Sequence, residues 1–118
     1  MATVTIELPS PPTLNTYWRR ILVRGQARTT LSAAGRAYKE RVWLLCQVAK
    51  VHPLRVPVKV TIRWRRPKRI GDLDNHFKAV LDAVRGCCFV DDSQVVELHA
   101  YRSDDKTHPG VTLTVEPA

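Results

Sequence analysis

The chain has 118 residues, 44% of them hydrophobic and 25% charged, which suits one average globular domain over residues 1–118 and leaves no room for a second. No stretch of about eighteen apolar residues is present, and the first residues lack a secretion signal. We therefore expect a cytoplasmic protein that does not span a membrane. The formal net charge of +8 favours a polyanionic partner.

This charge is distributed unevenly along the chain. Residues 1–71 carry 15 Lys and Arg against 2 acidic residues, a balance of +13. Residues 72–118 carry 4 basic against 9 acidic residues, a balance of −5. A basic half suits a nucleic acid, because each Lys or Arg near a phosphate releases condensed counterions. Charge alone does not separate DNA from RNA or from a membrane surface.

The first third of the chain predicts a strand, an ambiguous segment and a helix. Residues 3–8 alternate between apolar and polar side chains, which predicts a half-buried strand that the following prolines end. Within residues 13–31, segments 20–23 and 27–30 flank Arg24-Gly25-Gln26, which predicts either a hairpin or an ordered basic loop. Ser32 is a suitable N-cap for a helix that continues to about Lys50. The expected buried face of that helix is Tyr38, Val42, Leu45 and Ala49.

The remainder predicts three strands and a second helix. Residues 57–65 alternate and lead into the basic connection 66–69. A helix is expected over residues 74–84, followed by strands over 94–102 and 111–115. The order predicts an α/β or α+β domain with a small mixed sheet and two main helices. The expected faces are Val58, Val60, Ile62 and Trp64 in the first of these strands, Phe77, Val80, Leu81 and Val84 in the helix, and Val96, Leu98 and Ala100 in the next strand.

Three residue types carry no functional assignment at this point. Cys46, Cys87 and Cys88 lack the spacing of a disulfide framework or a zinc site, so we expect buried or partly buried free thiols. His76 is expected to be a solvated helix residue. The three tryptophans are expected in the core.

A group of acidic residues follows the basic half. Asp72 and Asp74 are two apart, so in an extended segment their side chains point to the same side. A helix that starts at Asp74 places Lys78 one turn along the same face. Asp91 and Asp92 open a strand after a short turn, and that strand could bring one of them against the first pair.

Clustered carboxylates repel one another unless a cation neutralises them, and Mg²⁺ is the hard cation that such oxygens hold. Each residue also has a purely structural interpretation. Asp74 suits a helix N-cap, and residues 91–93 suit a turn. Lys78 suits a surface ion pair with Asp74 or Asp82.

The combined pattern resembles the RusA family of Holliday-junction resolvases. Three motifs carry the resemblance: Asp72-Leu73-Asp74-Asn75-x-x-Lys78, then Leu81-Asp82-Ala83, then Gly86-x-x-Phe89-x-Asp91-Asp92-Ser93-Gln94-Val95. The early Pro11-Pro12-Thr13-Leu14-Asn15 is similar to the N-terminal signature of that family. The similarity covers nearly the whole chain.

This resemblance implies a homodimeric α/β nuclease that binds four-way junction DNA and nicks two symmetric strands with Mg²⁺ and no small-molecule cofactor. Its essential acids correspond to Asp72, Asp74 and Asp92, and its lysine to Lys78. Asp91 is expected as an accessory ligand or a positioning residue. From charge and position, the candidates for DNA contact are Asn15, Arg19, Arg20, Arg66, Lys68 and Arg69.

The sequence therefore predicts a magnesium-dependent endodeoxyribonuclease that resolves Holliday junctions in recombination and repair. Two alternatives remain open: a non-catalytic nucleic-acid-binding module of the same fold, and a metal-dependent nuclease for flaps or RNA–DNA hybrids. A homodimer also follows from the substrate, because paired cuts in a two-fold symmetric junction are most simply delivered by a two-fold dimer.

Overall fold

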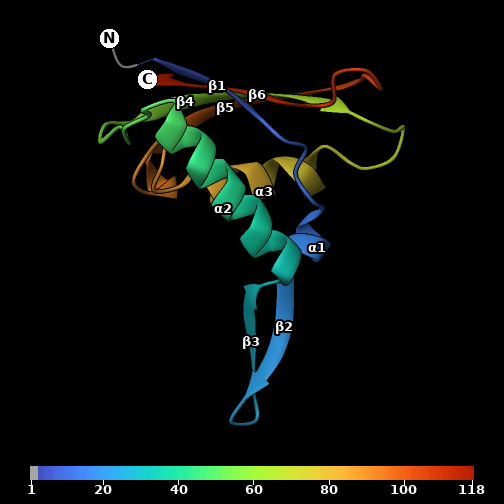
Figure 1. Cartoon of the computed structure of the whole chain (residues 1–118). Coiled ribbons are helices and arrows are strands. Elements are labelled where there is room, and N and C mark those ends of the chain that lie inside the picture. Colours follow the sequence, from blue (N-terminus) through green and yellow to red (C-terminus); the bar gives the residue numbers. More distant parts are fainter. Residues whose placement is uncertain (1–2) are drawn as a thin grey trace.

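The molecule is built on one mixed sheet with two helices packed on one of its faces (Figure 1). The computed structural model describes residues 3–118, so Met1 and Ala2 of the expected domain lie outside the described residues. The sheet has the strand order β1-β6-β4-β5, with β4 and β5 parallel and the other pairs antiparallel. The predicted mixed sheet with two main helices is confirmed. The strands of this sheet are β1 (Val4–Leu8), β4 (Val58–Arg66), β5 (Val95–Asp104) and β6 (Gly110–Pro117).

The two main helices are α2 (Ala33–Val48) and α3 (Asp74–Val84). Ser32 caps α2 as predicted, because its hydroxyl accepts a hydrogen bond from the Gly35 amide at 2.9 Å. The prediction for the buried face of α2 was partly wrong, since Ala49 is exposed and Cys46 lies inside. The β4 side chains that the alternation predicted to face inward lie in one buried core with residues of both helices. The residues buried at the centre include Val42, Val58, Val60, Ile62, Val80, Val84, Phe89 and Leu113.

The ambiguous segment 13–31 begins with a short helix, which was not predicted. The rest of the segment is a hairpin, one of the two expected alternatives. The short helix is α1 (Leu14–Tyr17), and the hairpin strands are β2 (Trp18–Val23) and β3 (Gln26–Leu31). Arg24 and Gly25 both have positive φ, at 52° and 77°, as a two-residue type I′ turn requires. The hairpin projects away from the sheet and its helices (Figure 1).

Strand β5 forms one edge of the sheet. Val96 and Leu98 lie on its apolar face, yet they are 62% and 37% exposed, because within residues 3–118 no strand continues the sheet beyond β5. A single 3-10 turn, η1 (Asp92–Gln94), leads into this strand. The three cysteines are buried and free, as predicted.

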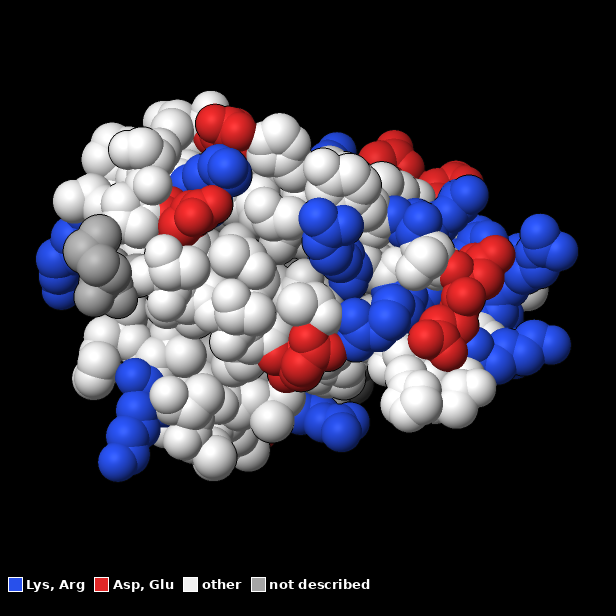
Figure 2. Space-filling model, turned by 90° about the horizontal axis from the view of Figure 1, so that it is seen from above, with Lys and Arg blue, Asp and Glu red and all other residues white. Residues whose placement is uncertain are grey.

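The face of the sheet opposite the helices is open (Figure 2). Lys and Arg gather at the end of this face where β4 runs into the basic connection, with acidic side chains between them. Elsewhere on this face, single charged side chains and small charged groups are scattered among uncharged ones. Among residues 3–118, no helix is both long and apolar enough to cross a membrane.

Candidate active site

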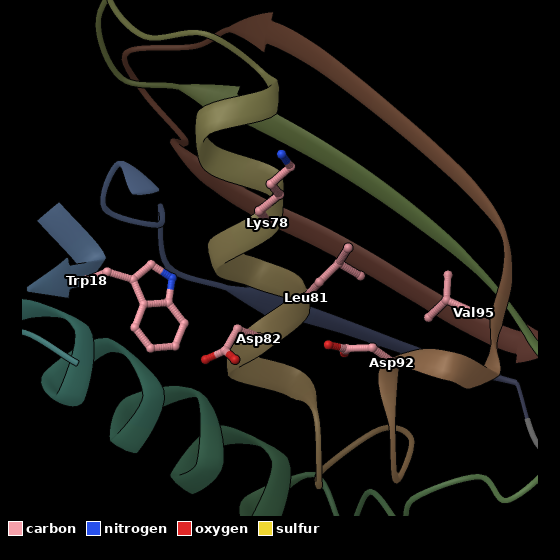
Figure 3. A pocket seen from close by; sticks show the side chains of 6 residues that line it. All are labelled: Trp18, Lys78, Leu81, Asp82, Asp92 and Val95. Carbon is pink, nitrogen blue, oxygen red and sulfur yellow. The ribbon is translucent and has the colours of Figure 1, made fainter. Parts of the chain in front are cut away.

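One face of α3 carries most of the polar side chains that the motifs selected. Asp74, Lys78 and Asp82 are spaced by four residues and therefore form one stripe along the helix. A pocket of about 360 Å³ opens beside this stripe. Asp92 points into it from η1, and Trp18 approaches from the start of β2 (Figure 3). The pocket is lined by Trp18, Lys78, Leu81, Asp82, Asp92 and Val95.

The paired aspartates have different surroundings. The Asp91 carboxylate caps η1 and accepts hydrogen bonds from the Ser93 hydroxyl at 2.6 Å and the Ser93 amide at 3.0 Å. The bond from the Ser93 hydroxyl is the main reason that the pKa of Asp91 lies below its ordinary value. Asp92 is exposed and lines the pocket together with Lys78. The turn interpretation is therefore correct for Asp91, and Asp92 is the member of the pair that faces the pocket.

Asp82 is the pocket residue whose partners the sequence did not reveal. It accepts a hydrogen bond from the Tyr17 hydroxyl and lies 3.7 Å from the Lys39 ammonium. Burial, and then the hydrogen bond to Asp82, raise the pKa of Tyr17 well above its ordinary value. Asp82 thus ties α1, α2 and α3 together. The alternative ion pair of Lys78 with Asp74 or Asp82 is absent from the described part of the chain, and Lys78 lines the pocket without a carboxylate partner there.

Asp74 is the first residue of α3, and the N-cap interpretation of it was wrong. Leu73 occupies the N-cap position and makes no side-chain capping bond. The carboxylate of Asp74 is exposed in the first helical turn, where the positive end of the helix dipole favours a negative charge.

Asp72 is exposed, but three neighbours fix the backbone beside it. The His76 ring donates from Nδ1 to the Asp72 carbonyl oxygen at 2.7 Å, since a carbonyl can only accept. The same ring stacks on the Trp64 indole, with ring centroids 4.1 Å apart. Arg66 donates from Nη1 to the Gly71 carbonyl at 3.0 Å. We call Trp64, Arg66 and His76 the loop brace.

Two expectations are corrected by the loop brace. His76 was expected in solvent, but it is only 6% exposed because its ring packs flat on Trp64. Arg66 was expected to contact DNA, but it is 8% exposed and its guanidinium is bound by Asp104 at 2.6 Å and by the Gly71 carbonyl. Arg66 therefore positions the loop that carries Asp72 and does not present its charge at the surface.

The ion pair between Arg66 and Asp104 has a consequence for pH dependence. The hydrogen bond from Arg66 is the main cause that lowers the pKa of Asp104 in the folded chain. A lowered folded pKa contributes stability above the unfolded value of about 3.9, and this contribution is lost as pH falls through the folded pKa. We expect Asp104→Asn to lower the melting temperature at pH 7, and the difference from the wild type to shrink below about pH 4. Thermal unfolding across this pH range measures it, and a constant difference would contradict it.

The predicted acids are not all brought together within one chain. Among residues 3–118, no three His, Cys, Asp or Glu side chains lie close enough together to hold a metal ion. Asp92 and Lys78 share the pocket, while Asp72 and Asp74 lie at the start of α3. The donors are nevertheless all carboxylate oxygens. Such a set fits Mg²⁺, which is commonly held by one or two carboxylates with water and substrate phosphate completing its shell.

Comparisons with known proteins identify the family of the chain. Residues 9–116 match the model of the family described as endodeoxyribonuclease RusA. The chain belongs to the RusA family. It is 40% identical over 100 residues to the crossover junction endodeoxyribonucleases RusA of Shigella sonnei strain Ss046 and Escherichia coli strain K12, covering 82% of this chain and 80% of each relative. The corresponding protein of Enterobacteria phage 82 is 39% identical over the same length. The predicted family is confirmed.

The remaining candidates for DNA contact in this RusA family member are at the surface. Asn15, Arg19, Arg20, Lys68 and Arg69 are all exposed. The Arg69 side chain is 86% exposed, and its Nε lies 3.4 Å from Asp104 Oδ2. Its guanidinium therefore remains accessible to solvent. Trp18 is a pocket residue that sequence reasoning missed. No periodic signal marked it, because the segment around it could not be assigned to a strand.

Proposed function

We propose that the chain is a magnesium-dependent endodeoxyribonuclease that resolves Holliday junctions by symmetric paired nicks during DNA recombination and repair in the cytoplasm. The main support is its 40% identity to named crossover junction endodeoxyribonucleases, across 82% of its length. The pocket supports the chemistry, since Lys78 and Asp92 line one hollow beside the acid-bearing stripe of α3.

The proposed roles follow from the charge of each group. Asp72, Asp74 and Asp92 are proposed to hold Mg²⁺, which would supply an activated water and charge stabilisation at the phosphate. Lys78 is proposed to bind the scissile phosphate or orient the attacking water, because its ammonium forms no ion pair with a carboxylate of residues 3–118. Asp91 was expected as an accessory ligand or a positioning residue, and its proposed role is the second, to hold η1 so that Asp92 faces the pocket.

The proposed active unit is a homodimer on a four-way junction. A two-fold dimer presents two pockets to two strands that are related by the symmetry of the junction. A single pocket would have to dissociate and rebind between the two nicks. Sedimentation of the purified chain with and without junction DNA tests this part of the proposal.

Asp72→Asn is the variant that tests the site assignment. Since Asn keeps the shape of the side chain but not its charge, the variant is expected to bind a synthetic four-way junction with wild-type affinity and to lose nicking. Nicking is measured on a labelled denaturing gel with Mg²⁺, and binding on a native gel with EDTA. Nicking by this variant at the wild-type rate would show that Asp72 is not an active-site residue.

The substrate panel separates the proposed function from the two alternatives. Wild-type protein is offered a four-way junction, a flap, a linear duplex and an RNA–DNA hybrid, each with Mg²⁺ and with EDTA. The proposal expects magnesium-dependent paired nicks on the junction only. Slower migration of the junction on a native gel without any nicking would indicate a non-catalytic binding module. Preferred cutting of the flap or the hybrid would indicate a metal-dependent nuclease for those substrates.

A further inference from the structure

The β2–β3 hairpin, residues 18–31, is a strongly basic ribbon that the proposed catalytic roles leave unused. It carries Arg19, Arg20, Arg24 and Arg28, all exposed, and the sequence has no acidic residue between Glu7 and Glu40. No ion pair within the described residues involves any of these four arginines. Four unpaired guanidinium groups on a projecting ribbon are suited to phosphate groups.

The root of the ribbon is fixed to the body. The Ser32 hydroxyl donates to the carbonyls of Thr16 and Tyr17, and the Ser32 amide donates to the Tyr17 carbonyl at 3.0 Å. Gly35 lies so close to this point that a Cβ there would meet the Tyr17 carbonyl oxygen at 2.2 Å. The Tyr17 hydroxyl in turn binds Asp82 on α3. The ribbon is therefore set at a defined place relative to the pocket.

The register of the ribbon shows which of its side chains continue the pocket wall. Trp18, Arg20 and Leu22 share one face, and their partners across the strands are Leu31, Thr29 and Ala27. Trp18 at the root of this face lines the pocket together with Lys78 and Asp92. Arg20 is therefore the next cation outward from the pocket on that face. Leu22, beyond it, is 77% exposed.

We propose that the ribbon is an arm that binds the DNA duplex leading away from the scissile phosphate, with Arg20 and Arg24 as its phosphate contacts. The inference rests on the proposed function, because it takes the pocket as the place where the cut strand lies. Six residues of β2 extend about 20 Å at about 3.3 Å per residue. A two-stranded ribbon also fits the major groove, which is about 12 Å wide.

The test neutralises the two arginines without disturbing the ribbon. Arg20→Gln is combined with Arg24→Asn, because Asn-Gly is a preferred type I′ pair and so preserves the turn. Binding to a four-way junction is measured by fluorescence anisotropy in EDTA, over a series of salt concentrations. We expect binding at least about 10-fold weaker near 0.1 M salt, and a slope of log K against log salt reduced by about 2.

The control is Arg41→Gln combined with Arg55→Gln, which removes the same charge from two exposed positions outside the ribbon. It is expected to keep the wild-type slope. An equal loss in both variants, or an unchanged slope in the ribbon variant, overturns the proposal. A ribbon variant that changes its sedimentation without DNA also overturns it, because the ribbon would then contact a second copy of the chain. If the wild type binds the junction but never nicks it, the proposed function is wrong. The salt dependence of binding in the two variants still tests whether the ribbon binds DNA.

Discussion

Replacing Asp92 with Asn is expected to lower the rate of junction nicking on the order of 100-fold or more, while Asp91→Asn should keep most of the activity. Removing a group that supports a metal ligand typically costs 10- to 100-fold, so removing a ligand itself should cost at least as much. Asp92 lines the pocket with Lys78, whereas the Asp91 carboxylate is bound by Ser93. Asn at position 91 also caps a helical turn well.

Single-turnover nicking of a labelled junction with saturating protein measures this difference without a contribution from binding. The melting temperatures of both variants serve as the control, and both are expected to stay close to the wild type because the two side chains are exposed. If Asp91→Asn instead stops nicking while Asp92→Asn cuts normally, the assignment of the pair is reversed.

Much of the frame of this molecule follows from side-chain periodicity. The strand over residues 57–65 and the helix over 74–84 were predicted nearly to the residue, because both bury one regular face in the same core. The same alternation also contained information that the interpretation did not use. Every second residue of β4 is buried, as in Val58, Val60, Ile62 and Trp64. Continuing this alternation to residue 66 already implied that Arg66 is buried. Its charge suggested the surface, and the ion pair with Asp104 explains why the inward position is tolerated.

Other features depend on contacts between distant segments and could not be predicted from one segment at a time. His76 lies inside because Trp64, from a different element, offers a flat partner for its ring. Asp82 is held by Tyr17 and Lys39, which reach it from two other helices. The exposure of Val96 depends on the position of β5 at the edge of the sheet, which the order of elements along the chain does not determine.

The acidic site also combines features that local periodicity predicts with features that depend on contacts between distant segments. The motif spacing identified every residue of the stripe on α3, because a helix converts sequence separation into position. It could not establish how near Asp72 and Asp74 lie to Asp92, since Asp92 lies on a separate element, η1. The loop brace is equally non-local, and it fixes the backbone on both sides of Asp72 through residues of β4 and α3.

Gly71→Ala is expected to be the most damaging change in the loop that carries Asp72. Gly71 has φ of +110°, and a Cβ there would lie 2.7 Å from His76 Cε1 and 3.2 Å from Trp64 Cη2. The His76 ring cannot move aside freely, because it is stacked on Trp64 and bonded to the Asp72 carbonyl. We expect a loss of about 1–3 kcal/mol in the free energy of unfolding from backbone strain alone. Displacement of Asp72 should lower nicking by about 10- to 100-fold as well.

Gly86→Ala is the matched control, since Gly86 also has positive φ, at 87°, but a Cβ added there would meet no atom within 4 Å. This control carries the conformational cost of alanine without the contact with His76. It is expected to lose stability in chemical denaturation but to nick junctions at the wild-type rate per folded molecule. If Gly71→Ala behaves in the same way, with reduced stability and normal nicking, the loop brace does not position Asp72. Loss of nicking in Gly71→Ala alone would tie the catalytic geometry to the packing of His76 on Trp64.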